Sequence, residues 1–206
     1  AAAGEGNNDT FDGDGGNDIL QLSTGTHTLT NNSKVVNIET ILAHSSGSTV
    51  DLSTQVEAFT ITGAAGIDDL TGGSGNDIIT GSGGNDVLKG GTGNDSIDGG
   101  ADNDALTGGS GDDTFTVGAG SDTISDLTTG DDLVVTGGTV AANDVSTFVA
   151  DNDTKNTGGT VTINAATGGS TITMTDSNTG AYTLAGGSGV DIITGGSGND
   201  IITGSG

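Results

Sequence analysis

Aspartate recurs at intervals of nine residues along much of this chain. Of its 28 acidic residues, 25 are Asp and only Glu5, Glu39 and Glu57 are Glu. Asp has a short side chain that stays close to the backbone and favours turns. Carboxylate and carbonyl oxygens are the ligands that hard cations such as Ca²⁺ prefer. The chemistry that this pattern could do is therefore the coordination of a hard cation by several similar loops.

A nine-residue frame describes the pattern. It repeats without interruption from Gly63 to Val134, and two further frames lie at each end of the chain, over 4–21 and 186–203. In all twelve frames the sixth residue is Asp and the eighth is a large apolar residue, such as Ile79 or Ile202. The sixth-position aspartates are Asp9, Asp18, Asp68, Asp77, Asp86, Asp95, Asp104, Asp113, Asp122, Asp131, Asp191 and Asp200. Two unbroken columns at a fixed spacing predict one structural unit per frame.

Each part of the frame has a physical interpretation. Glycine, which is frequent at the first, second and fourth positions, permits positive φ and a close approach to an ion, so loop carbonyls can turn inward. The sixth-position Asp then closes the loop with a carboxylate. The last three residues, such as Ile78–Thr80, have high β-propensity, and we expect the eighth residue to point into a core.

The composition limits what else can hold the chain together. Hydrophobic residues make up 30%, aromatic residues 2%, and the net charge is −25, which is typical of a disordered chain unless something other than a large apolar core stabilises it. Lys34, Lys89 and Lys155 are too few to neutralise that charge, and the same excess excludes nucleic acid as a partner. The absence of Cys excludes thiolate metal sites, and no apolar run is long enough to predict a membrane span.

The frame resembles the nonapeptide G-G-x-G-x-D-x-U-x of the RTX (repeats-in-toxin) calcium-binding repeats. The resemblance implies an all-β fold, a right-handed parallel β-roll or β-solenoid in which two nonapeptides make one turn. It also implies that calcium lies between a loop and the loop two frames later. One edge would then stack Asp68, Asp86, Asp104 and Asp122, and the other Asp77, Asp95, Asp113 and Asp131. The central array would bind about six Ca²⁺ ions as its only cofactor.

The same resemblance assigns the ligands. They would be the twelve sixth-position aspartates together with the loop carbonyls of Gly72, Gly73, Gly75, Gly81, Gly84, Gly90, Gly91, Gly93, Gly99, Gly108, Gly109 and Gly111. Some residues depart from the pattern: Asp102 and Thr129 replace the fourth-position glycine of their frames, and Val117 and Asp126 replace the first. We therefore expect the array to end near Asp131.

The chain divides into five segments. Residues 1–21 are expected to end one array, 63–134 to form the central array, and 186–206 to start a further one. Between them, 22–62 and 135–185 form two β-rich spacers, whose alternating runs such as 160–163 predict half-buried strands. The spacers could continue the solenoid as turns without calcium loops, or they could form a separate β-sandwich or a lateral contact surface.

The sequence contains no recognisable catalytic motif, and we expect the chain not to be an enzyme. His27 and His44 stand alone and are predicted to be ordinary surface residues. The pair Asp112 and Asp113 is interpreted as a ligand and its solvated neighbour. Ice binding is disfavoured because Thr92 and Asn94 form the only pair of the type found in ice-adhering RTX proteins.

The apolar seventh-position residues Ile78, Val87, Ile192 and Ile201 are expected to face outward. They reflect either β-propensity alone or an apolar contact with a neighbouring copy of the chain.

The family resemblance implies export in an unfolded state by a type I secretion system, followed by folding outside the cell where calcium is high. Several arrays joined by spacers are most similar to a secreted bacterial protein of the extracellular cell surface, either a surface-layer (S-layer) protein or an adhesin. Its expected partners are calcium and other copies of itself. The alternative is a C-terminal RTX export and folding module of a secreted hydrolase or toxin.

Overall fold

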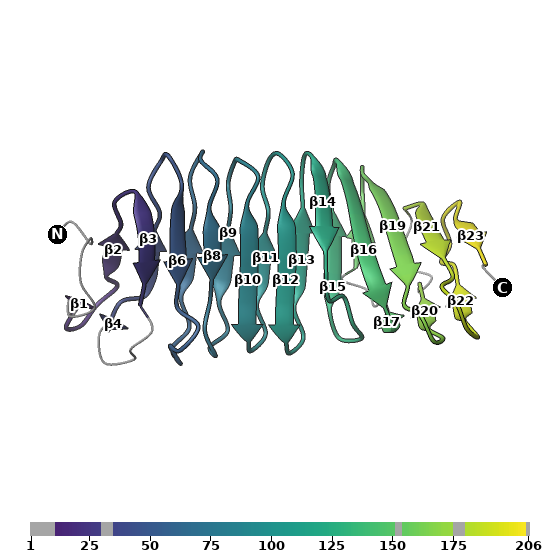
Figure 1. Cartoon of the computed structure of the whole chain (residues 1–206), viewed down its shortest axis with the longest axis horizontal. Helices are drawn as coiled ribbons and strands as arrows, with labels where there is room; N and C mark the ends of the chain where they lie inside the picture. The colour runs from purple at the N-terminus through teal and green to yellow at the C-terminus, as the bar shows by residue number, and fades with distance from the viewer. Residues whose placement is uncertain (1–10, 30–34, 151–153, 175–179, 205–206) are drawn as a thin grey trace.

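The computed structural model describes residues 11–29, 35–150, 154–174 and 180–204. Over these residues the chain is all-β, with short parallel strands and no helix. Figure 1 shows them wound into one elongated β-solenoid whose N- and C-terminal ends lie at opposite ends of the long axis. The described residues thus contain no helix that could cross a membrane.

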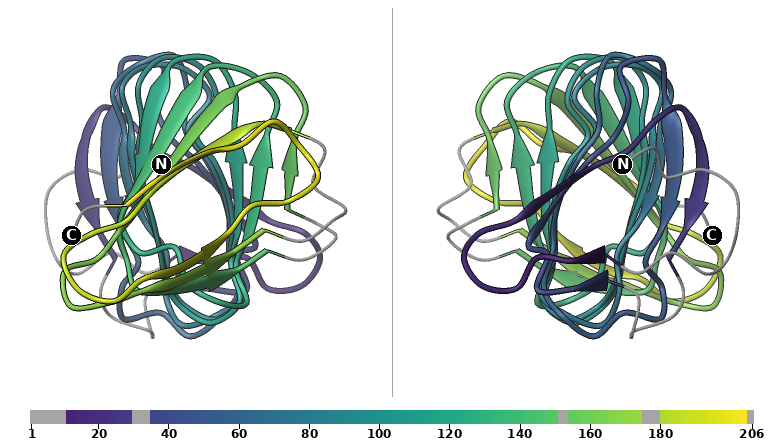
Figure 2. Two further views of the ribbon diagram at one scale, coloured as in Figure 1. Left: turned by 90° about the vertical axis from the view of Figure 1, so that its right-hand side faces the viewer. Right: turned by 90° about the vertical axis from the view of Figure 1, so that its left-hand side faces the viewer.

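Two long parallel sheets form the faces of the solenoid, and Figure 2 shows their strands superposed along the long axis. The ten-stranded sheet contains β3 (Gly25–Thr28), β6 (Ser48–Asp51), β8 (Asp69–Thr71), β10 (Val87–Thr92), β12 (Ala105–Ser110), β14 (Ser121–Ile124), β16 (Thr139–Val145), β19 (Thr160–Ala165), β21 (Tyr182–Ala185) and β23 (Ile201–Thr203). The eight-stranded sheet contains β2 (Ile19–Gln21), β5 (Thr40–Leu42), β7 (Thr60–Thr62), β9 (Ile78–Thr80), β11 (Ser96–Asp98), β13 (Thr114–Val117), β15 (Asp132–Val135) and β18 (Lys155–Asn156).

Two smaller parallel sheets lie towards the ends of the chain. The N-terminal one pairs β1 (Phe11–Asp12) with β4 (Val35–Val36). The C-terminal one contains β17 (Thr147–Val149), β20 (Thr171–Thr173) and β22 (Ile192–Thr194). Both involve spacer residues, where the solenoid gains a third face.

The strand register shows how many residues make one turn of the solenoid, here called a rung. In the central array Leu70 pairs with Leu88, and Leu88 with Leu106, so each rung contains 18 residues, or two nonapeptide frames. In the spacers the rungs are longer. For example, Val161 pairs with Tyr182, and the N-terminal rung advances by 21 residues between Asp18 and Glu39.

The spacer strands belong to the same long sheets as the repeat strands. The N-terminal spacer supplies β3, β5, β6 and β7, and the C-terminal spacer supplies β16, β18, β19 and β21. The interpretation of the spacers as rungs that continue the solenoid is therefore confirmed, and a separate β-sandwich is not formed by the described residues. The segment boundaries themselves stay predictions.

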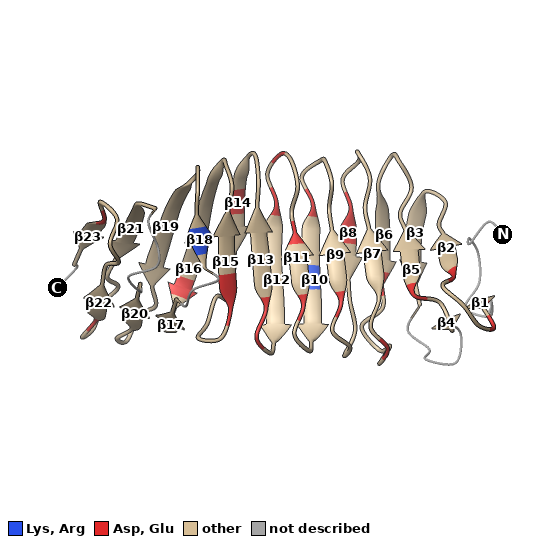
Figure 3. Cartoon of the chain, turned by 180° about the vertical axis from the view of Figure 1, so that it is seen from behind, with Lys and Arg blue, Asp and Glu red and all other residues tan. Residues whose placement is uncertain are grey.

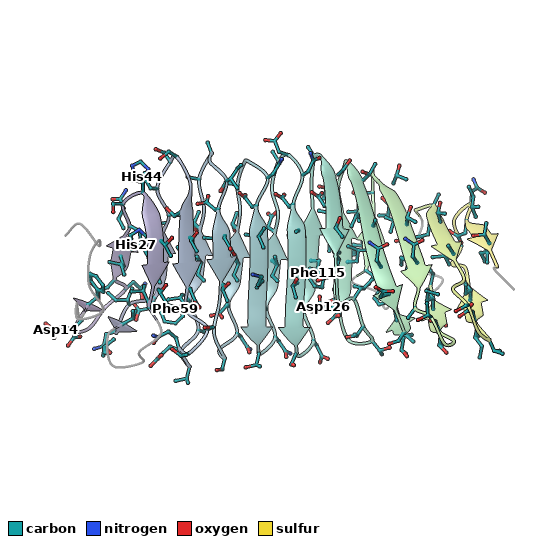
Figure 4. The ribbon with its side chains drawn as sticks, in the orientation of Figure 1. Asp14, His27, His44, Phe59, Phe115 and Asp126 are labelled. Atoms are coloured by element: carbon teal, nitrogen blue, oxygen red, sulfur yellow. The ribbon has the colours of Figure 1, made fainter. Side chains whose placement is uncertain are left out.

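The core is a file of inward-facing apolar side chains, mainly the eighth residues of the frames. Across the central array these side chains are at most 1% exposed, and Figure 4 labels Phe115 among them. Ile202 differs from the prediction, being 50% exposed. The reason is that β23 is the outermost strand of the ten-stranded sheet, so no described strand covers its far side.

Two expectations about other side chains had different outcomes. Ile78, Ile192 and Ile201 are exposed as expected, whereas Val87 is half-buried. The prediction that His27 is a surface residue is wrong, because it is only 6% exposed. It lies on β3 opposite the buried Val50, so it faces the core, where Nε2 lies 2.8 Å from the carbonyl oxygen of Ser23.

Candidate metal centre

The sixth-position aspartates of the central array are buried in two columns, one beside each long sheet. Each is at most 4% exposed. Figure 3 colours acidic residues red, and many lie near the ends of strands; the blue segments lie on β10 and β18, the strands that contain Lys89 and Lys155. The residues are Asp68, Asp86, Asp104 and Asp122 in one column, and Asp77, Asp95, Asp113 and Asp131 in the other. Eight carboxyl groups have thus been removed from water, which is costly unless each charge is compensated.

Hydrogen bonds along each column orient the carboxylates. The backbone N–H of Asp77 donates to Oδ1 of Asp95 at 2.8 Å, and that of Asp95 donates to Oδ1 of Asp113 at 2.8 Å. The other column repeats this arrangement. For example, the backbone N–H of Asp86 donates to Oδ1 of Asp104 at 2.9 Å. We call each such series an aspartate ladder. It fixes one carboxylate oxygen against the preceding rung and leaves the second oxygen to face the loop.

The second oxygen has no protein partner in the middle of the array. Oδ2 of Asp86, Asp95 and Asp104 is buried and accepts no hydrogen bond from any described residue. Buried acceptors without partners are rare in folded proteins and need an explanation. A bound cation would be one, because these three aspartates have repeat loops on both neighbouring rungs.

At the borders of the array the second oxygen is used by the protein itself. Oδ2 of Asp77 accepts the backbone N–H of Gly73 at 2.8 Å. Oδ2 of Asp131 accepts the backbone N–H of Thr128 at 2.7 Å and its hydroxyl at 3.1 Å. The carboxylates that remain available to a cation are therefore those of the inner rungs.

The first-position glycine of each frame borders a space that we call the loop cradle. It lies between the sixth-position carboxylate of the same loop and the first-position carbonyl of the next rung. A Cβ atom on Gly90 would overlap Oδ2 of Asp95 and would lie 2.6 Å from the carbonyl oxygen of Gly108. The same arrangement recurs at Gly81. Any side chain at this position would fill the cradle, which explains why glycine is required there.

The conformational prediction for these glycines was partly wrong. The first-position glycines do not adopt positive φ, and their role is the close approach alone. Positive φ occurs at later positions of the loop, for example 123° at Gly91 and 118° at Gly93.

The donor set of a cradle fits calcium. It offers carboxylate and backbone carbonyl oxygens, and the described residues contain no group of three or more Asp, Glu, His or Cys side chains suited to a metal. Such all-oxygen sites, completed by carbonyls, suit Ca²⁺ rather than zinc. Of the predicted carbonyl ligands, those facing an aspartate oxygen across a cradle are Gly81, Gly90, Gly99 and Gly108. The carbonyl of Gly73 instead accepts the backbone N–H of Thr92 at 2.9 Å.

Comparison with known families agrees with this geometry. The family model described as the RTX calcium-binding nonapeptide repeat matches the chain in four copies, over residues 3–25, 62–97, 89–124 and 178–206. These matches cover more than half of the chain. The chain belongs to the RTX family. Searches of curated proteins and of solved structures gave no match. The protein is thus a calcium-binding structural repeat region folded as a β-solenoid.

In the C-terminal RTX frames, the sixth-position carboxylates accept the same kind of ladder hydrogen bond. The backbone N–H of Ser170 donates to Oδ1 of Asp191 at 2.9 Å, and that of Tyr182 donates to Oδ1 of Asp200 at 3.1 Å. Both carboxylates therefore face a rung of the C-terminal spacer. Asp9 lies outside the described residues.

At the departures from the RTX pattern, other protein groups make the local contacts. Asp126, labelled in Figure 4, accepts the backbone N–H groups of Gly108 at 3.0 Å and of Gly109 at 2.7 Å. Val117 is fully buried at the first position, where other frames have glycine. Asp102 adopts the positive φ of the glycine that it replaces, at 75°. Protein groups thus take over the contacts of the last loops.

A second ladder was missed by the sequence analysis. The backbone N–H of Asn94 donates to Oδ1 of Asn76 at 2.9 Å, and that of Asn103 donates to Oδ1 of Asn85 at 3.0 Å. These fifth-position asparagines bond to the preceding rung, so this ladder runs opposite to the aspartate ladder. The Asn that precedes the sixth-position Asp in four consecutive frames of the central array was the available signal.

The spacers continue the aspartate column with apolar residues. Asp122 pairs with Val140, which pairs with Val161, which pairs with Tyr182, and all three replacements are at most 2% exposed. In the spacer rungs, buried apolar side chains therefore occupy the position that a carboxylate occupies in the RTX rungs. These rungs need no cation at that position.

Burial changes the acidity of the inner carboxyl groups. Desolvation raises the pKa of Asp86 and of Asp95 to about 6, and that of Asp104 to about 7. Repulsion from neighbouring aspartates of the same ladder adds to this effect, while the ladder hydrogen bonds oppose it. In the absence of a cation these groups therefore hold protons more tightly in the folded chain than in the unfolded one.

This shift predicts the pH dependence of the calcium-free chain. Because the folded pKa values lie above the ordinary value of 3.8, the folded state binds more protons between about pH 4 and 7. Stability in chelator should thus fall as the pH rises through that window. We expect a stronger strand signal in EDTA at pH 5 than at pH 7.5, measured by circular dichroism. A strand signal that rises with pH in EDTA would contradict this.

Proposed function

We propose that this chain is a structural segment of a secreted bacterial cell-surface protein, either a surface layer or an adhesin, which folds when it binds calcium outside the cell. The observation that carries the proposal is the continuity of the long sheets through arrays and spacers. Alternating calcium rungs and apolar rungs give one extended rod, a form suited to building or spanning a surface. Separate arrays joined in this way are not needed by a module that only assists export.

We propose the inner loop cradles as the calcium sites. Asp86, Asp95 and Asp104 offer a buried oxygen without a protein partner, and the carbonyls of Gly99 and Gly108 face the cradles of Asp86 and Asp95 from the next rung. Bound calcium would supply the positive charge that compensates the buried carboxylates. The aspartate ladders hold those carboxylates in place, and the glycines keep the cradles open.

We further propose that the segment acts without catalysis. Its buried carboxylates are engaged in the ladders, and the ring nitrogens found in hydrogen bonds contact only serines, His27 at Ser23 and His44 at Ser46. The seventh-position residues Ile78, Ile192 and Ile201, each more than half exposed, support contacts with other copies of the chain.

The cellular role can be tested on cells that produce the protein. Antibodies against this chain should label intact cells in calcium-containing medium, and a brief EDTA wash should reduce the labelling several-fold as the rod unfolds. A cytoplasmic protein serves as the control for cell integrity. Recovery of the chain only from the medium, attached to a hydrolase activity, would overturn the proposal and favour the export-module alternative.

A further inference from the structure

The loop that contains Asp18 faces a rung that is not a nonapeptide, yet its geometry repeats that of the array. The backbone N–H of Asp18 donates to Oε2 of Glu39 at 2.8 Å, as that of Asp77 donates to Asp95. In the next strand the backbone N–H of Thr40 donates to the carbonyl of Asp18 at 3.1 Å. Glu39 therefore occupies the place of a sixth-position aspartate on the following rung.

A loop cradle is present here as well. A Cβ atom on Gly13 would overlap the carbonyl oxygen of Asn37 and lie 2.6 Å from Oδ2 of Asp18. The backbone N–H of Gly13 donates to the carbonyl of Val36 at 3.0 Å. First-position glycines of the array make the same bond, to the residue that precedes the first-position glycine of the next rung. Asn37 thus takes the place of a first-position glycine and presents its carbonyl to the cradle.

One oxygen of the Asp18 carboxylate resembles those of the inner array, although the residue as a whole is only partly buried. Its Oδ2 atom is buried, and none of the described residues donates a hydrogen bond to it. That oxygen and the carbonyl of Asn37 border one cradle, and the carboxylate of Glu39, on the same rung as Asn37, accepts the backbone N–H of Asp18. This combination of orphaned carboxylate oxygen and facing carbonyl is the one that fits calcium in the central array.

The loop before Glu39 is shorter than a nonapeptide loop and ends in glutamate in place of aspartate. Asn37 and Glu39 are two positions apart, whereas Gly90 and Asp95 are five apart in a nonapeptide loop. Asn37 is held at a φ of 53°, and its side-chain amide donates to Oδ1 of Asp12 at 3.0 Å, which positions the shortened loop.

We propose that Asp18, the carbonyl of Asn37 and Glu39 bind a calcium ion between the N-terminal array and its spacer. The inference rests on the proposed calcium sites of the array and extends them to a rung without the repeat. The N-terminal family match ends at residue 25, so Glu39 lies in a segment to which no calcium role is assigned. The site would fasten the first spacer rung to the preceding array.

The variant Glu39→Gln tests this site. Gln keeps an oxygen that can accept the backbone N–H of Asp18 but removes the negative charge. At saturating calcium, equilibrium dialysis with metal analysis should find one ion fewer per chain than in the wild type. The matched control is Glu57→Gln, since Glu57 is exposed and should leave the ion count unchanged. An unchanged count in Glu39→Gln would overturn the proposal.

A second variant approaches the same site from the other side. Gly13→Ala fills the cradle and should lose the same ion, so the double variant should also be one ion short rather than two. Circular dichroism at saturating calcium should show the wild-type strand signal for each. The loss of several ions from Glu39→Gln would contradict a single site. A wild-type chain that binds no calcium would instead refute the proposed array sites.

Discussion

Removing calcium at neutral pH is expected to abolish most of the strand signal of this chain in far-UV circular dichroism, and millimolar calcium is expected to restore it. The reason is the burial of eight aspartates in the two ladders. The sequence has only three lysines against 28 acidic residues. Lys89 lies on the surface, where its Nζ atom is 3.7 Å from Oδ1 of Asp69. It therefore does not compensate the charge of the buried aspartates. Without a cation the ladders place like charges on successive rungs in a poorly solvated interior.

The size of the effect follows from ligand linkage. If the three inner sites of Asp86, Asp95 and Asp104 each hold calcium at ten times its dissociation constant, each contributes ~1.4 kcal/mol, or ~4 kcal/mol in total. That is close to the lower end of the net stability of a typical domain, which is about 5–15 kcal/mol. The core of the RTX rungs is a narrow file of apolar side chains. The free energy gained by burying them is too small to replace the contribution of calcium. We expect recovery in the millimolar range that is typical of extracellular calcium modules.

Two controls separate calcium binding from general screening. Sodium chloride at equal ionic strength should restore little signal, because screening does not supply ligands to buried oxygens. Magnesium should also be less effective, because it demands a near-ideal octahedral geometry and dehydrates reluctantly. A far-UV spectrum that is the same in EDTA and in calcium would show that the ladders do not need a cation.

Much of this architecture can be predicted from the sequence because RTX frames have one fixed length. With 18 residues per rung, the spacing alone places Asp77 over Asp95 and Ile79 over Ile97, and the structure confirms both. The glycine requirement at Gly90 was also visible, although its cause is steric contact rather than positive φ.

The spacers could not be predicted in the same detail because their rungs vary in length. The step from Asp18 to Glu39 is 21 residues, and other spacer rungs differ again. A change in rung length hides which residues stack, so no pattern in the sequence indicates that Tyr182 continues the column of Asp122 or that His27 faces the core. For the same reason Glu39 had no recognisable place in a frame.

Replacing Gly90 with alanine is expected to destabilise the central array and to remove a calcium ion from it. The new Cβ would overlap Oδ2 of Asp95 and approach the carbonyl of Gly108, the two oxygens that face each other across the cradle. Overpacking of this kind costs roughly 1–3 kcal/mol. If the variant also loses the ion of that cradle, a further ~1.4 kcal/mol follows at ten times the dissociation constant. Gly90→Ala should therefore show a lower urea midpoint in calcium and at least one ion fewer per chain.

Gly83→Ala is the matched control. Gly83 is a third-position glycine with no atom within 4 Å of an added Cβ, and its φ is not positive. It forms a bridge with Ala101, which in turn bridges Ala119, so alanine already occupies the equivalent place on the next two rungs. This substitution should leave the ion count unchanged and alter stability by no more than about 1 kcal/mol, with a gain expected from the less flexible unfolded chain.

The comparison of the two variants isolates the cradle from the general effect of replacing glycine. Both add one methyl group to the central array, and neither position requires positive φ. Only Gly90 borders a carboxylate oxygen and a carbonyl from the next rung. If Gly90→Ala and Gly83→Ala had the same ion count and the same urea midpoint, the cradles could not be the calcium sites, and the first-position glycines would need another explanation.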